Sequence, residues 1–106
     1  MTEASVLEQN WQMPHLLLFE IWEDPENHAF EMSPVTDRGD EVRRQIEPKA
    51  VLRHSFRAKS DFEACQMNYD WHGWGQWKPE PDWTEQLFTA EEVAFQERYL
   101  AIRNGS

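Results

Sequence analysis

The chain has 106 residues, of which 40% are hydrophobic and 28% are charged, and its formal net charge is −10. This length indicates one domain, and the balance of apolar and charged residues is typical of a folded chain rather than a disordered one. The acidity argues against general nucleic-acid binding, because Lys and Arg supply most of the affinity for phosphates. It is compatible with a basic protein partner, or with solubility alone.

Several classes of protein are excluded by what the sequence lacks. The longest apolar run, 16–19, is too short to span a bilayer or to form a signal-peptide core. The first residues carry acids and no Lys or Arg, so we expect a cytoplasmic protein without membrane contact. The single cysteine, Cys65, excludes an internal disulfide and a Cys-rich zinc site. No histidine spacing or glycine-rich loop predicts a metal or cofactor.

The charge is unevenly distributed along the chain. Residues 38–59 hold seven bases against three acids, whereas the remaining residues hold three bases against seventeen acids. Because opposite charges attract, we expect the basic middle to be neutralised by the acidic ends in the fold, rather than to form a separate anion site.

The sequence predicts a loose arm over residues 1–12, or a short helix there anchored by Val6, Leu7 and Trp11. It predicts a single α+β domain over residues 13–104. Residues 14–22 predict a strand. Its continuous apolar part is expected to be fully buried, and its last residues alternate between apolar and polar side chains, so that this end is half exposed. The Asp-Pro turn that follows predicts a hairpin with a second strand over 28–36, which Pro34 restricts to a short or edge position. A third strand is predicted over 50–58, with its inward side chains at Leu52, His54 and Phe56.

Two helices are predicted in the middle of the chain. Asp40 is expected to cap a short helix over 40–46, which Pro48 ends. Ser60 and Glu63 form a capping box for a second helix that Gly73 ends. One helical stripe of this second helix carries Phe62, Cys65 and Tyr69.

The last helix has the most specific local signal in the chain. Thr89 and Glu92 form its capping box, Phe88 and Val93 match a hydrophobic staple, and the helix is expected to run to about 103. The order of elements predicts a small two-layer α+β sandwich. In it, a mostly antiparallel three-stranded sheet packs against two to three helices and is followed by a long Trp-rich loop.

Four of the six tryptophans lie within residues 68–83, beside two glycines and two prolines that prevent a long regular element. A loop of this length is usually functional or disordered, and its aromatic density indicates packing. Burial favours a lid over the sheet for most of Trp71, Trp74, Trp77 and Trp83. A recognition surface is the second interpretation, and a sugar-stacking platform is the third.

The recognition surface leads to the first functional hypothesis, a small acidic module that binds a basic protein, as inhibitors and immunity or anti-defence proteins do. Aromatic side chains beside carboxylates suit Arg and Lys through cation–π contacts and charge together. The residues expected to bind the partner are Trp74, Trp77, Trp83, Glu80, Asp82 and Glu85. No catalytic residue is assigned under this hypothesis.

Two alternatives belong to other classes. A small enzyme or ligand-binding protein would hold a pocket under the Trp-rich loop, with polar groups supplied by His54, Cys65, Asp70 and His72. For each of these side chains, a capping, solvated or inert role is the simpler expectation. A homodimer or larger structural oligomer, with an edge strand or tryptophan face buried against a second copy, is the other alternative.

Overall fold

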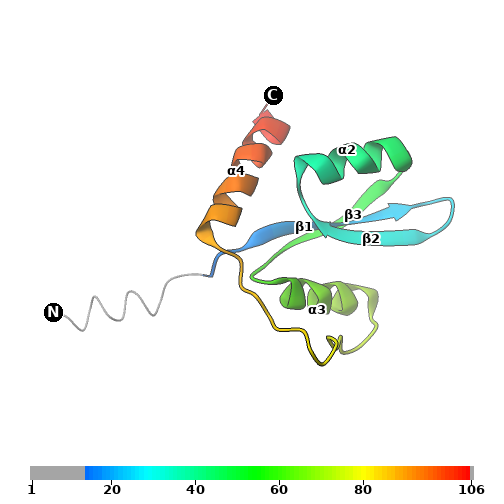
Figure 1. Ribbon diagram of the computed structural model, residues 1–106. Coiled ribbons are helices and arrows are strands. Elements are labelled where there is room, and N and C mark those ends of the chain that lie inside the picture. Colours follow the sequence, from blue (N-terminus) through cyan, green and yellow to red (C-terminus); the bar gives the residue numbers. More distant parts are fainter. Residues whose placement is uncertain (1–13, 106) are drawn as a thin grey trace.

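The computed structural model describes residues 14–105, so the predicted arm over 1–12 lies outside the described residues (Figure 1). The described residues form three strands and three helices, and the expected α+β class with an antiparallel three-stranded sheet is confirmed. In chain order the elements are β1 (Leu17–Asp24), β2 (Ala29–Pro34), α2 (Asp37–Ile46), β3 (Val51–Ala58), α3 (Asp61–His72) and α4 (Ala90–Gly105).

The sheet has the strand order β2-β1-β3, so β1 is the central strand. Phe19 of β1 stands opposite Phe56 of β3, and the register shifts by one residue after Ile21. Because of this bulge, Leu52 pairs with Trp22, which belongs to the other face of the sheet. The prediction that Leu52 faces inward is therefore wrong, since its side chain is 44% exposed.

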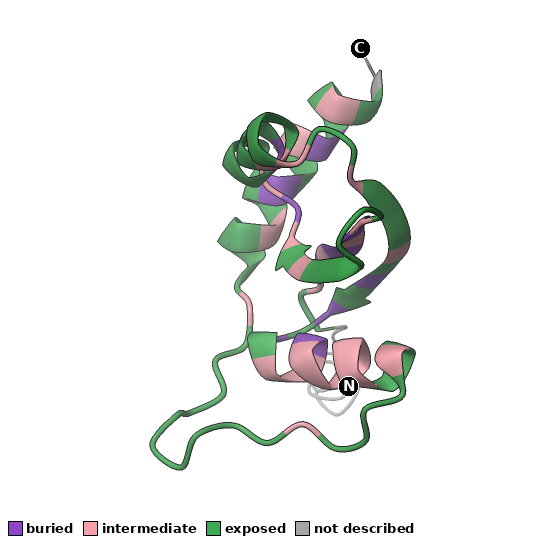
Figure 2. Ribbon diagram, turned by 90° about the vertical axis from the view of Figure 1, so that its right-hand side faces the viewer, coloured by how far each residue is buried: buried purple, intermediate pink, exposed green. Residues whose placement is uncertain are grey.

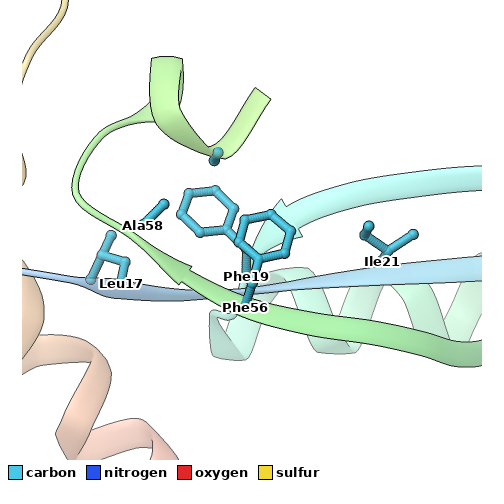
Figure 3. Packing of buried hydrophobic residues seen from close by; sticks show 6 residues of the cluster. Leu17, Phe19, Ile21, Phe56 and Ala58 are labelled. Atoms are coloured by element: carbon cyan, nitrogen blue, oxygen red, sulfur yellow. The ribbon is translucent and has the colours of Figure 1, made fainter. Parts of the chain in front are cut away.

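The apolar core lies on one face of the sheet, beneath α3 (Figure 3). Phe19 and Phe56 stack with ring centroids 5.6 Å apart, and Ala64 of α3 packs against them. Phe88 and Val93, the predicted staple of α4, both pack against the same cluster. The buried residues of this core cluster are Leu17, Phe19, Ile21, Phe56, Ala58 and Ala64.

The opposite face of the sheet carries α2 and the C-terminal half of α4, so helices lie on both sides (Figure 1). The contacts on this face are polar. Glu20, which is 6% exposed, accepts two hydrogen bonds from Arg103 at 3.0 and 2.9 Å and one from the Trp22 indole at 3.0 Å. The guanidinium of Arg43 lies 3.6 Å from the Trp22 ring.

Asp40 completes this buried charge network from α2. The sequence predicts Asp40 as the cap of that helix, but the cap is Thr36, whose hydroxyl accepts from the Gly39 amide at 2.9 Å. Asp40 lies inside the first turn, 2% exposed, where it pairs with Arg43 at 2.9 Å and Arg103 at 3.0 Å. Its carboxylate also accepts the Tyr99 hydroxyl. Asp40 is thus a link between two helices rather than a cap.

The basic segment 38–59 is partly neutralised by acids from outside it, as expected. Lys49 pairs with Glu26 at 3.6 Å, Arg53 with Glu23 at 2.8 Å, and Arg57 with Glu97 at 3.7 Å.

Gln96 fixes the position of α4 beside the central strand. The register of β1 with β2 ends at Pro34, and beyond it the Val35 amide still donates to the Leu18 carbonyl at 3.0 Å. The Gln96 amide pairs with the peptide groups that remain there. Its oxygen accepts from the Leu18 amide at 2.8 Å, and its nitrogen donates to the carbonyls of Leu18 and Val35, both at 3.0 Å. One side chain therefore satisfies backbone groups that a longer strand would otherwise pair.

Candidate functional site: an aromatic surface at the end of helix α3

The segment between α3 and α4 runs along the outer side of α3, which lies between this segment and the sheet (Figure 1, Figure 2). Gln66 of α3 anchors it, since its side chain donates to the Gly75 carbonyl at 3.1 Å and accepts from the Trp77 amide at 2.9 Å. At the far end, the buried Ser60 hydroxyl donates to Glu85. The Phe88 amide donates to the Lys59 carbonyl at 2.9 Å.

The lid interpretation of the tryptophans is therefore wrong. Figure 2 shows residues 73–87 exposed along nearly their whole length. Trp74 and Trp83 are each 56% exposed, and Trp71 is 39% exposed. The physical reason is that Ala64 and Met67 of α3 already cover this face of the sheet, so the segment meets only the outer side of the helix.

The apolar stripe predicted on α3 is the side that meets this segment. Phe62 packs edge-on against Trp77 with centroids 5.3 Å apart, and Tyr69 packs edge-on against Trp74 at 5.2 Å. The stripe that faces the sheet instead passes through Ala64 and Met67. Periodicity identified a genuine apolar side of the helix but could not tell which of two layers would cover it.

At the C-terminal end of α3, six rings form one continuous cluster, which we call the aromatic surface. His54 of β3 stacks on Trp71 at 5.6 Å, and the edge of Phe30 from β2 meets Trp71 at 5.9 Å. His72 contacts Phe30 and Trp71, both at 4.9 Å. The aromatic surface consists of Phe30, His54, Tyr69, Trp71, His72 and Trp74.

His72 and Trp74 form the tightest stack of this cluster, with centroids 3.9 Å apart and planes 6° from parallel. Gly73 between them adopts a left-handed conformation with φ 75°, as its predicted role at the helix end requires. This turn places the two flanking side chains face to face. The cluster therefore continues from the sheet, across the end of α3, into the following segment.

The predicted partner-binding residues divide into two groups. Trp74 and Trp83 are well exposed, and Glu80 and Asp82 are exposed in the same segment. Trp77 is half-buried against Phe62, and Glu85 is held by Ser60. Within residues 14–105, neither Glu80 nor Asp82 forms an ion pair, so both carboxylates present unpaired charge to solvent.

The four predicted pocket residues do not meet in one cleft. His54 and Asp70 line a shallow hollow of about 300 Å³ together with Met67 and Trp71. His72 lies beside this hollow in the aromatic surface.

Cys65, the fourth of these residues, does not line the hollow and is half-buried on the Phe62–Tyr69 stripe of α3. Burial raises the pKa of its thiol, and the negative charge of Asp61 raises it further. Both effects disfavour the thiolate that a nucleophile requires.

Two further observations limit the chemistry of the described residues. Within 14–105, no group of three or more His, Cys, Asp or Glu side chains is arranged to hold a metal ion. No helix in the same part of the chain combines the length and the apolar character that crossing a membrane requires.

Comparison with models of known protein families, with curated proteins and with solved structures gives no match for this chain. Its function is therefore inferred from the geometry and chemistry of its own surfaces.

The sequence does not predict the contact of Phe30 with Trp71, since Phe30 belongs to the hairpin. It predicts His54 beneath the Trp-rich loop as a polar group of a pocket, whereas the structure stacks this side chain on Trp71. Alternation in β2 and β3 indicates which side chains share a face, but the meeting of these rings depends on where the end of α3 lies over the sheet.

Proposed function

We propose that this protein is a cytoplasmic protein-binding module whose aromatic surface receives a basic region of a partner. The observation that carries this proposal is the continuous cluster of rings in which Phe30, Trp71 and Trp74 are 41%, 39% and 56% exposed. Exposed aromatic clusters of this kind mark interaction sites, because keeping large apolar rings in water is unfavourable.

The chemistry of the surroundings favours Arg and Lys on the partner. Asp70 borders the aromatic surface, and Glu80 and Asp82 follow in the adjoining segment with their carboxylates unpaired. A guanidinium that lies on an indole face while it pairs with a carboxylate gains from both contacts. The net charge of −10 would also speed the encounter with a basic protein.

The aromatic surface is held in advance of binding. His54 is held in strand β3 of the sheet, and Gln66 fixes the backbone on both sides of Gln76 by two hydrogen bonds. A surface that is already ordered loses little conformational entropy when a partner binds. This arrangement suits an inhibitor-type protein that covers a basic active site.

The experiment is affinity capture with the immobilised wild-type chain, followed by measurement of the dissociation constant for the retained protein. Trp74→Ala should weaken the complex by at least about tenfold, as is typical when a central interface aromatic is truncated. Ile46→Ala is the matched control, because Ile46 is 72% exposed on α2, on the opposite face of the sheet. Raising the salt concentration should slow association.

A retained protein that binds Trp74→Ala as tightly as wild type would contradict the proposal. Self-association of the wild type that Trp74→Ala abolishes, seen by sedimentation at two concentrations, would instead assign the surface to a homodimer.

The hollow beside His54, Asp70 and Trp71 supports a second candidate function, the binding of a small ligand. An imidazole, a carboxylate and an indole face in one place provide polar and stacking contacts together. Screening a library of small aromatic and cationic compounds by NMR tests it. Shifts confined to His54 and Trp71, lost in His54→Ala, would support the ligand function.

A further inference from the structure

A second surface lies at the opposite end of α3, in a groove between the start of α4 and the ends of β1 and β2. Its volume is about 480 Å³. Its floor and walls are apolar, and the residues concerned are Leu17, Pro34, Val35, Phe88 and Phe95. Among them, Val35 is buried whereas Phe95 is 61% exposed. A phenyl ring therefore stands largely in water on the wall of an apolar groove.

The position of Gln96 explains why this groove stays open. Its side chain occupies the edge of β1 beside the end of β2, so the first half of α4 is held at this end of the sheet. Phe95, the preceding residue, is then carried to the groove and away from the core cluster. Gln96 thus anchors α4, while the ring of the adjacent Phe95 is not buried by other apolar side chains.

The polar border of the groove is acidic. Asp61, Glu91 and Glu92 line it, and no Lys or Arg among residues 14–105 does so. Glu92 is engaged by the Thr89 amide, but Asp61 and Glu91 form no ion pair within residues 14–105. One base is near, since the Arg98 guanidinium lies 5.8 Å from the Phe95 ring, but it does not line the groove. The charged side chains that line the groove are therefore all acidic.

We infer that this groove docks a basic amphipathic segment of a partner protein, with apolar side chains against Phe88 and Phe95 and Lys or Arg at the acidic border. An amphipathic helix laid in a groove is a recurrent mode of recognition, and charge complementarity selects the sign of its polar side. The inference does not depend on the aromatic surface, which lies at the other end of the twelve-residue helix α3.

Charge also decides against two other occupants. Residues 1–12 contain Glu3 and Glu8 and no Lys or Arg, so their side chains would add negative charge to an acidic border. A second copy would bring a net charge of −10 to the same place. Both arrangements bring like charges together, which opposes association.

The test uses the full chain and a fluorescein-labelled synthetic peptide of leucine and lysine, with leucines at i, i+3, i+4 and i+7. Anisotropy should show saturable binding that weakens at least about tenfold in Phe95→Ser. Glu91→Gln combined with Asp61→Asn should also weaken it at least about fivefold. A peptide with glutamate in place of lysine should bind at least about tenfold more weakly to the wild type.

Control variants separate this groove from general attraction between a cationic peptide and an acidic protein. Glu41→Gln and Ile46→Ala should each leave the affinity for the leucine–lysine peptide within about twofold of wild type, because both residues are exposed on α2 and neither touches the groove. Equal loss in Glu41→Gln and Glu91→Gln would overturn the inference, and so would unchanged binding in Phe95→Ser. If Trp74→Ala bound the captured partner as tightly as wild type, only the proposal for the aromatic surface would be contradicted.

The rival occupants give different results. In the variant Val6→Ser/Leu7→Ser/Trp11→Ser, stronger peptide binding together with NMR shifts at Val35 and Phe95 would assign the groove to the chain's own N-terminal residues. Self-association that Phe95→Ser abolishes would assign it to a second copy. Either result would overturn the inference. We expect unchanged groove resonances in the triple variant and the same sedimentation coefficient for wild type and Phe95→Ser.

Discussion

The imidazole of His72 lies flat on the indole of Trp74, 3.9 Å away, because Gly73 between them turns the backbone through a left-handed conformation. Two residues that flank a helix end thus become a stacked pair. The pair joins the helix to the segment that follows and orients the most exposed ring of the aromatic surface.

Gly73→Ala should lower the free energy of unfolding by about 1 kcal/mol, because a Cβ disfavours φ near 75°. No atom lies within 4 Å of the position that the Cβ would take, so steric overlap with neighbours adds nothing. Urea unfolding measures the change. Gly73→Asn should cost less, since asparagine tolerates this conformation. Equal losses for the two variants would show that the left-handed turn is not the cause.

Acrylamide quenching should distinguish the tryptophans by their exposure. Trp74→Phe and Trp83→Phe should each remove a readily quenched, red-shifted part of the emission, because both indoles are 56% exposed. Trp77→Phe should remove a more shielded part, because that ring packs against Phe62. Fluorescence spectra and quenching constants of the three variants check this. The same quenching constant for all three tryptophans would contradict the arrangement of the segment.

Trp77 and Trp83 should differ in their contribution to stability. Trp77→Ala should cost about 2 kcal/mol, less than truncation of a fully buried aromatic, because the ring is half-buried on α3. Trp83→Ala should stay within about 0.5 kcal/mol of wild type, as expected of an exposed side chain. Thermal or urea unfolding of the two variants gives the comparison directly. A larger loss of stability for Trp83→Ala than for Trp77→Ala would show that the Trp83 side chain is buried.

Asp40 should contribute stability that is lost in acid. Burial alone would raise the pKa of its carboxyl, but hydrogen bonds from Tyr99 and Arg43 and the charge of Arg103 outweigh it, so the pKa is lowered. A lowered pKa in the fold stabilises the protein above the unfolded value of about 3.9. This contribution is lost as the pH falls through the folded pKa.

Asp40→Asn should therefore cost about 3 kcal/mol at pH 7, because it leaves Arg43 and Arg103 partly unpaired in a buried site. The loss relative to wild type should shrink as the pH falls below about 4, because the wild-type Asp40 then takes up a proton on unfolding, and it should be smallest below the lowered pKa of the folded state. Urea unfolding at pH 7 and pH 3 measures both differences. Asp37→Asn, at an exposed position of the same helix, serves as the control. A loss that is independent of pH would contradict an electrostatic role.

Gln96→Ala should cost about 3 kcal/mol, because it leaves the Leu18 amide and the Val35 carbonyl without partners in a buried place. Gln45→Ala, on the exposed side of α2, is the control and should change the free energy of unfolding by less than about 0.5 kcal/mol. Hydrogen exchange of the Leu18 amide should speed up in Gln96→Ala alone. Unchanged exchange at Leu18 would show that α4 is positioned by other contacts.

Local signals in the sequence were sufficient for the elements and many of their ends. Ser60 caps α3 by accepting from the Glu63 amide at 3.0 Å, and Thr89 accepts from the Glu92 amide at 3.1 Å, as the two capping boxes predict. Gly73 ends α3 in the predicted conformation. These features depend on residues that are close in the chain, so local chemistry specifies them. The α+β class follows from the order of these elements.

The side of each element that meets another was decided only by the tertiary structure. The stripe through Phe62 and Tyr69 covers the outer segment, whereas Ala64 and Met67 face the sheet, because small side chains at Ala64 and Ala58 let the helix approach closely. Asp40 has the sequence pattern of a helix cap and Gln96 that of an ordinary polar helix residue, yet Asp40 also pairs with Arg103, and Gln96 with Leu18 and Val35, all about sixty or more residues away in the chain. Local patterns contain no information about such distant pairs, so the charge network, the groove beside α4 and the aromatic surface all appear only when the chain is folded.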